Sequence, residues 1–252
     1  MMRFRMLLLL TLGVCSACAI DPQADWSDAE FERQNEIAKA ACAAENHAEA
    51  IRIWQPWAER GQPRAQSNLG YVYLQGCTDA LKNNGYGSER DIPKGLALLE
   101  QAVAQNVPQA QYLLGEWLYS PTYSESERQR GLKLLEQAAG QGHLLAQTSV
   151  AHAYAMAGND EKSFYWNEKA AQQGDAEAQG KTANMLSAGE GTPRDCERAW
   201  YWAEQAVAQG RAETMRMLAN WYAKGNACVQ PDAAKAREWA AKAEAASRRD
   251  QF

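Results

Sequence analysis

Three kinds of sequence feature are missing from this chain of 252 residues, and each absence narrows the possible folds and functions. β-Branched residues are sparse and no run alternates apolar with polar residues, so β-strands are not expected. No linker rich in Gly, Ser or Pro divides the chain, which argues against several separate globular domains. No cluster of Lys and Arg forms a basic patch, which argues against binding of nucleic acid or of anionic lipid.

Familiar catalytic and cofactor-binding patterns are also missing. The chain has no His-Glu-x-x-His pair for zinc and no Ser-x-x-Lys for acylation. The loop Gly189-Glu190-Gly191 is not followed by Gly-Lys-Ser/Thr, so it is not expected to hold phosphate. His47, His143 and His152 are scattered, which gives no metal-ligand spacing. These absences favour a protein that is not an enzyme and that has neither cofactor nor metal.

What the chain does contain is a repeated word that ends in Ala-Ala/Val-x-Gln-Gly. It is clearest at residues 100–106, 136–142, 168–174 and 204–210, and looser at 55–61 and 241–247. The closing residues of the copies are Gly61, Asn106, Gly142, Gly174, Gly210 and Ser247, which are separated by 45, 36, 32, 36 and 37 residues. A period of this size is typical of a solenoid of helix pairs. Such a fold favours a binding scaffold.

A second recurring word precedes each closing residue by about 30 positions and reads Ala-x-x-x-Leu-Gly-x-x-Tyr-x-x-Gly, clearest at 65–76. Its spacing places these residues on one face of a helix. Five small residues on this face are expected to let a neighbouring helix approach closely: Gly70, Gly115, Ala151, Ala183 and Ala219. Glycines at the end of the word, namely Gly76, Gly189 and Gly225, are expected to cap the helix with positive φ.

The second helix of each unit carries an apolar stripe with helical spacing. Residues eight positions before the closing residues are Ile53, Leu98, Leu134, Trp166, Trp202 and Trp239. Residues four positions before them are Trp57, Ala102, Ala138, Ala170, Ala206 and Ala243. We expect these residues to form the core, because large and small side chains alternate along one face.

Together the two words resemble the Sel1-like repeat family, a relative of the tetratricopeptide repeat. Residues 178–210 and 214–246 resemble the family pattern most, and the resemblance extends over roughly 62–247 and back to about 28. It implies an all-α fold, a right-handed α-solenoid of about six antiparallel helix pairs at residues 28–247, with a short tail at 248–252.

The first 18 residues have the features of a lipoprotein signal peptide. Arg3 and Arg5 precede an apolar stretch that is too short to span a membrane, and Ser16-Ala17-Cys18 resembles a lipobox. Cys18 is therefore expected to carry the acyl chains, including palmitate, with 19–27 as a tether. Ala19 after the cysteine implies the outer membrane, by resemblance to lipoprotein sorting, with the solenoid facing the periplasm.

An alternative reading of the same segment is a cleavage site at Ala17-Cys18-Ala19, which would release a soluble periplasmic protein. Removing Arg3 and Arg5 with the segment takes the formal charge from −5 to −7. Contact with a membrane is then expected through the lipid anchor only.

The start of the solenoid can also be predicted. Ser27 and Glu30 have capping-box spacing, and Trp26 with Phe31 forms a hydrophobic staple. The first helix should therefore begin near Asp28 and run to about residue 44.

Four cysteines remain after residue 18, namely Cys42, Cys77, Cys196 and Cys228. An even number in an oxidising compartment indicates disulfides, and four cysteines allow three pairings. Positions in the repeat favour Cys42–Cys77 and Cys196–Cys228, each joining adjacent units.

The resemblance to tetratricopeptide repeats implies that the first helices line a concave face. Matching that motif predicts a partner-binding strip for a protein or extended peptide, formed by Tyr71, Tyr112, Glu116, Tyr119, His152, Asn184, Arg216, Asn220 and Lys224. The insertion at 77–93 is a second candidate surface, because loops often carry function.

These observations favour a non-catalytic interaction scaffold in the bacterial envelope. One alternative, implied by other Sel1-like periplasmic proteins, is an immunity protein that neutralises a toxic effector in the periplasm. A second alternative is a hydrolase or β-lactam-binding protein, although the acylating motif is absent.

Overall fold

The computed structural model describes residues 26–76 and 90–249. Within these ranges the chain forms twelve α-helices and no strand. Their bounds are α1 Asp28–Ala43, α2 His47–Glu59, α3 Pro63–Gln75, α4 Ile92–Ala104, α5 Pro108–Leu118, α6 Glu125–Gly140, α7 Leu144–Met156, α8 Asp160–Gln172, α9 Ala176–Ala188, α10 Cys196–Ala208, α11 Ala212–Lys224 and α12 Ala233–Arg249. The predicted all-α solenoid of about six helix pairs is confirmed.

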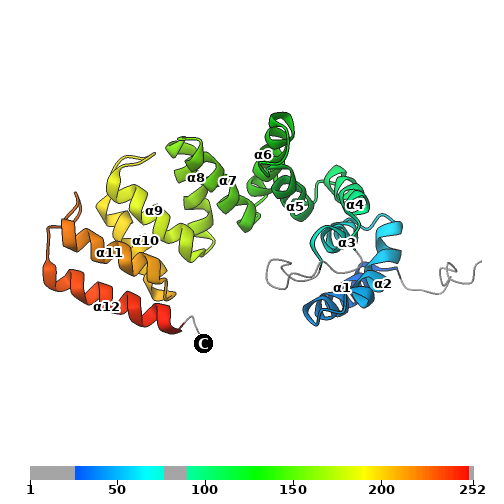
Figure 1. The fold of residues 1–252 in the computed structure, drawn as a ribbon, viewed down its shortest axis with the longest axis horizontal. Coiled ribbons are helices and arrows are strands. Elements are labelled where there is room, and N and C mark those ends of the chain that lie inside the picture. The colour runs from blue at the N-terminus through cyan, green and yellow to red at the C-terminus, as the bar shows by residue number, and fades with distance from the viewer. Residues whose placement is uncertain (1–25, 77–89, 250–252) are drawn as a thin grey trace, which may run out of the picture.

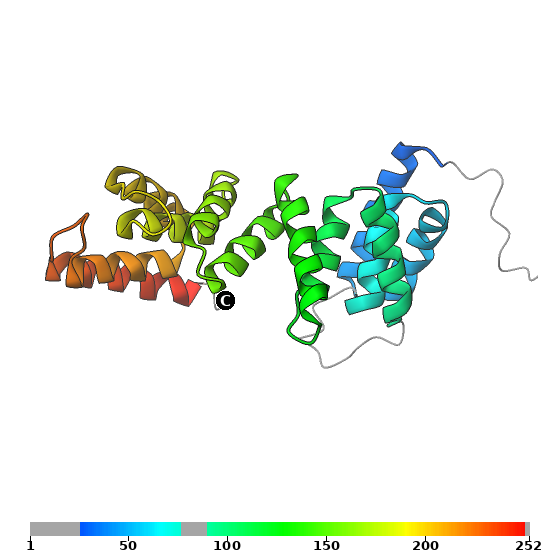
Figure 2. The ribbon, with the colours of Figure 1, turned by 90° about the horizontal axis from the view of Figure 1, so that it is seen from above.

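The helices form a curved array in chain order, from α1 and α2 at one end to α11 and α12 at the other (Figures 1 and 2). Each helix contacts the next along the chain. None of the helices in the described ranges is long and apolar enough to cross a bilayer.

The positive φ predicted for Gly76, Gly189 and Gly225 is confirmed at 82°, 78° and 73°, and five of the six closing residues adopt positive φ as well. Gly61, Gly142, Gly174 and Gly210 have φ between 83° and 92°, and Asn106 has φ 61°. This backbone conformation suits glycine and asparagine and ends each second helix. The sixth position differs, because α12 continues through Ser247 to Arg249.

The predicted apolar stripe forms the core between the helices. All six residues four positions before a closing residue are buried, from Trp57 to Ala243. Three of the larger residues, Ile53, Leu134 and Trp202, are also buried, and the other three are half-buried. The core is therefore a series of small clusters between neighbouring helices, as expected for a solenoid.

Glycines set the distance between the two helices of a unit in the N-terminal half. Gly70 of α3 faces Gly95 of α4, where a Cβ on Gly95 would lie 3.0 Å from the carbonyl oxygen of Gly70. Gly115 of α5 faces Gly131 of α6 in the same way, at 2.8 Å from a Cβ on Gly131 to the Gly115 oxygen. The predicted role of Gly70 and Gly115 in close helix approach is confirmed.

Four units share a pair of hydrogen-bonded glutamines, a feature that was not predicted. The glutamine before each closing residue donates to a glutamine on the first helix of its unit, an arrangement we call the glutamine bridge. The pairs are Gln105–Gln66, Gln141–Gln111, Gln173–Gln147 and Gln209–Gln179, with N–O distances of 2.8, 2.7, 2.7 and 2.9 Å. All four first-helix glutamines are buried.

The glutamine bridge also reaches the preceding unit. Gln179 donates to the carbonyl oxygen of Ala171 at 3.3 Å, and Gln209 to that of Gly174 at 3.0 Å. The Ala171 oxygen also accepts from the backbone N–H of Gly174 at 2.9 Å, so Gln179 adds a second donor at the end of α8, while Gly174 follows the helix. The recurring Ala-Gln at the start of the first helices was a signal that could have revealed this role.

The helix start predicted at Ser27 is present. Ser27 is the N-cap of α1, and its hydroxyl accepts from the backbone N–H of Glu30 at 3.2 Å. The rings of Trp26 and Phe31 both pack edge-on against Trp57 of α2. The signal peptide with Cys18, most of the tether, and residues 77–89 of the insertion lie outside the described residues, so the predictions made for them remain predictions.

Candidate functional site

A groove opens between the three C-terminal units, where α7, α8, α9 and α11 meet. Its volume is about 700 Å³. Polar and charged side chains line most of it, with Met185, Met217 and Trp221 as its main apolar residues. The groove combines a sizeable concave volume with several converging polar groups and is therefore the candidate binding site.

Four residues of the predicted partner-binding strip meet in this groove. His152, Asn184, Arg216 and Asn220 line it, and all four are exposed. They come from α7, α9 and α11, at corresponding positions of neighbouring units. Lys224 is exposed at the end of α11 but does not line the groove.

The aromatic residues of the predicted strip do not line the groove. Tyr71, Tyr112 and Tyr119 are half-buried and pack against the cores between units, and the contact with a partner predicted for them remains a prediction. Tyr112 stacks on His143 of the next unit with ring centroids 4.8 Å apart. Glu116 is exposed on α5, away from the groove. Contacts between units thus occupy the tyrosines that were expected to contact a partner.

His143, the residue beneath Tyr112, caps α7. Its Nδ1 accepts from the backbone N–H of Ala146 at 3.2 Å, which requires an unprotonated nitrogen there. Its Nε2 lies 2.8 Å from Oε1 of Gln109 and is therefore the donor. Burial lowers the pKa of His143. The ring thus joins α5 to α7 in its neutral form.

Each of the three cations that line the groove forms an ion pair with a carboxylate. Lys181 and Arg211 each lie 2.8 Å from a carboxylate oxygen of Glu177. Arg211 and Arg216 lie 3.0 and 3.2 Å from Glu213. The hydrogen bond from Lys181 holds the pKa of Glu177 below its usual range, and a bond from its own backbone N–H does so for Glu213.

Asn167 and Thr214 on the groove floor were not predicted. They are 5% and 3% exposed and both line the groove. A signal for Asn167 was present, because it lies seven positions before a closing residue. The other units have Trp54, Leu99, Leu135, Ala203 and Ala240 there. A polar residue in an otherwise apolar column indicates a local function.

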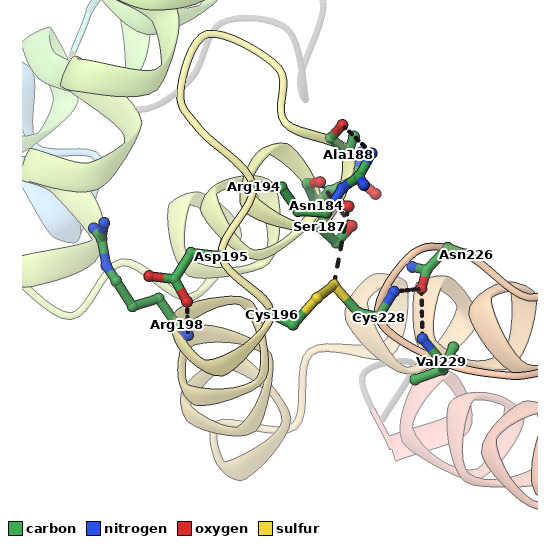
Figure 3. Close-up of a disulfide and its surroundings, with 10 residues drawn as sticks. All are labelled: Asn184, Ser187, Ala188, Arg194, Asp195, Cys196, Arg198, Asn226, Cys228 and Val229. Carbon is green, nitrogen blue, oxygen red and sulfur yellow. Dashed lines mark hydrogen bonds between the residues drawn. A yellow bond between two sulfur atoms is a disulfide. The ribbon is translucent and has the colours of Figure 1, made fainter.

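A disulfide joins the start of α10 to the segment after α11. Cys196, the first residue of α10, is bonded to Cys228 after α11, with 5.3 Å between the Cα atoms (Figure 3). This is the pairing that the repeat positions predict. Cys42 is also disulfide-bonded, and its expected partner Cys77 lies outside the described residues. Among the described residues, no three His, Cys, Asp or Glu side chains are grouped to hold a metal ion.

The sequence was compared with models of known protein families and with known proteins. A model of the Sel1 repeat matches residues 63–78, 80–107, 108–143, 151–175, 176–210 and 212–247. An uncharacterized protein of Neisseria meningitidis is 27% identical over 166 residues, which are 58% of this chain and only 35% of that protein.

Two solved structures share the fold. A Sel1 repeat protein of Oxalobacter formigenes is 24% identical with a TM-score of 0.61, covering 84% of each chain. A protective antigen of uropathogenic Escherichia coli is 22% identical with a TM-score of 0.66, covering 86% of this chain and 49% of that one. Six matched repeats, over most of the chain, show that it belongs to the Sel1 repeat family.

Proposed function

We propose that the groove binds an extended segment of another protein and that the chain acts as a non-catalytic interaction scaffold. The observation that carries this proposal is the meeting of His152, Asn184, Arg216 and Asn220 in one groove of about 700 Å³. Sel1 repeat proteins in general mediate protein–protein interactions, which supports the same reading.

The dimensions of the groove suit a short extended segment. It crosses the first helices of three units, α7, α9 and α11. Of these, α9 and α11 contact each other, and packed helices are roughly 9 Å apart, a distance that about three residues of an extended chain cover. Exposed asparagines along this path offer both a donor and an acceptor to a peptide backbone.

A photo-crosslinking experiment tests this function. The crosslinking amino acid p-benzoylphenylalanine replaces Asn220 in the groove or Tyr201 on α10, which is exposed and does not line the groove. We expect irradiated envelopes to give a discrete adduct from the Asn220 variant and not from the Tyr201 variant. The identity of the adduct by mass spectrometry separates an assembly factor from a toxic effector. Equal adducts at both positions would contradict binding in the groove.

We also propose that the protein acts in the envelope, anchored through Cys18 to the outer membrane. The Cys196–Cys228 disulfide supports an oxidising compartment, because disulfides rarely persist in the cytosol. The test is metabolic labelling with a palmitate analogue. Label should be incorporated in the native chain and absent from Cys18→Ala, with the variant recovered in the soluble fraction. An unlabelled native chain would favour the soluble periplasmic form instead.

A further inference from the structure

The two walls of the groove differ in how their charges are satisfied. On α9 and α11, Lys181, Arg211 and Arg216 are all paired with Glu177 or Glu213 at distances of 2.8 to 3.2 Å. Each of these cations thus has a carboxylate partner, although the three cations share two carboxylates. The groups that do lack a partner are oxygen atoms, and they lie on the other side of the groove.

Three oxygen-bearing side chains follow one face of α8. Asp160, Ser163 and Asn167 all line the groove. Their spacing of three and four residues places them in a row of about 10 Å along the helix. Within the described residues, the carboxylate of Asp160 makes no ion pair or side-chain hydrogen bond. This row, which we call the α8 wall, presents mostly hydrogen-bond acceptors.

Asn167 is the buried member of the α8 wall. Only 5% of it is exposed, and its Nδ2 donates to the backbone oxygen of Ser163 at 3.0 Å. Its Oδ1 accepts no hydrogen bond from any described residue, although the side chain lines the groove. Oδ1 is not among the described buried side-chain atoms that lack a partner, so solvent in the groove reaches it. This oxygen is therefore available to accept from a donor that enters the groove.

A second carboxylate lies at the Asp160 end of the α8 wall. The loop after α9 runs directly over the start of α8, since a Cβ on Gly191 would lie 2.1 Å from the carbonyl oxygen of Asp160. Glu190 precedes Gly191, lines the groove and makes no ion pair within the described ranges.

We propose that the α8 wall binds a lysine or arginine side chain of the partner, so that the segment bound in the groove is basic. The cationic N–H groups donate to Oδ1 of Asn167 and to the carboxylates of Asp160 and Glu190. The methylene stem packs on Met185, which lines the groove beside Asn167. This inference rests on the proposed function and specifies the chemistry of its partner.

The test selects peptides and then removes the acidic charges. Random 12-residue peptides displayed on phage are selected on the purified full chain, and synthetic copies are measured by fluorescence anisotropy. We expect the selected peptides to be enriched in Lys and Arg. Their affinity should fall roughly tenfold for Asp160→Asn/Glu190→Gln and should weaken as salt rises. Glu197→Gln/Glu204→Gln on α10 removes the same charge outside the groove and should leave affinity unchanged.

A groove-blocking variant, Asn220→Trp, separates the two ways in which the proposals can fail. Peptides that still bind this variant with full affinity, or a selection that yields no binder, would contradict binding in the groove and with it the inference. Peptides that need an open groove but show no enrichment in Lys and Arg would overturn only the inference. An unchanged affinity for Asp160→Asn/Glu190→Gln would do the same.

Discussion

The two halves of the solenoid use corresponding repeat positions for different purposes. In the N-terminal half, Tyr71 and Tyr112 are half-buried and pack between units. In the C-terminal half, the residues at the same two repeat positions, Asn220 and Arg216, are exposed and line a groove. The comparison shows that repeat position fixes where a side chain lies, while its size and neighbours decide whether it stabilises the scaffold or remains free for a partner.

The largest expected effect comes from removing the disulfide in the C-terminal half. Cys196→Ser/Cys228→Ser opens a loop of 32 residues, which should lower the free energy of unfolding by about 3 to 4 kcal/mol. Because contacts in a solenoid are local, hydrogen exchange should quicken mainly in α9 to α11. Equal loss of protection in α3 to α5 would show that the two halves unfold together and would contradict their independence.

A glycine substitution tests the close helix contact in the N-terminal half. A Cβ on Gly131 would lie 2.8 Å from both the Gly115 oxygen and the Tyr119 nitrogen, and these backbone atoms have little freedom to move. Gly131→Ala should therefore destabilise the fold by about 2 kcal/mol in urea unfolding.

Gly140 in the same helix is the matched control. A Cβ there would meet nothing within 4 Å. Gly140→Ala should stabilise the protein by about 0.5 kcal/mol through helix propensity alone. If Gly131→Ala behaved like this control, the close contact would not limit packing in this half.

A third experiment concerns the glutamine bridge, which both halves share. Gln179→Ala removes the hydrogen bond to the Ala171 oxygen and the acceptor of Gln209, and should cost about 1 kcal/mol. The last unit has Met215 and Ala246 at the two positions of the bridge, and both are buried. Gln179→Met/Gln209→Ala introduces the same apolar pair. The double variant should lose less free energy of unfolding than the two single variants together. Strict additivity in urea unfolding would mean that the two glutamines act separately.

The smallest expected effect depends on pH and lies at the junction of the halves. Burial lowers the pKa of His143, so the unfolded chain binds its proton more readily. The stability contributed by His143 is then complete above about pH 6.5, the usual value, and is lost as pH falls through the lower value in the folded state. His143→Asn keeps an N-cap without a titrating group. Unfolding curves for this variant should lose the corresponding slope below pH 6.5.

The scaffold could be predicted from the sequence because its signals repeat. Six closing residues in register identified the helix pairs, and a column of Trp57 and five alanines identified the core. The disulfide between Cys196 and Cys228 followed from the same register. Each of these features depends on spacing along the chain, which a sequence displays directly.

The site was harder to predict because it depends on contacts between units. The ion pair between Glu177 and Lys181 has helical i,i+4 spacing, but the pairing of Glu177 with Arg211 joins α9 to the start of α11, and no spacing rule reveals it. The burial of Tyr112 depends on His143, which belongs to the next unit. Asn167 could have been found, because it breaks an apolar column that every other unit maintains.

The glutamine bridge places different demands on the sequences of the two neighbouring units that it joins. In three of its four copies the later unit supplies both glutamines, while the earlier unit supplies only main-chain oxygens, as at Ala58, Ala139 and Ala171. In the remaining copy, Asn106 accepts through its side chain. Main-chain oxygens are present whatever the sequence. A unit can therefore change its own surface side chains without losing its hydrogen bonds to the next unit. The sequence of the earlier unit in each pair is thus free to diversify.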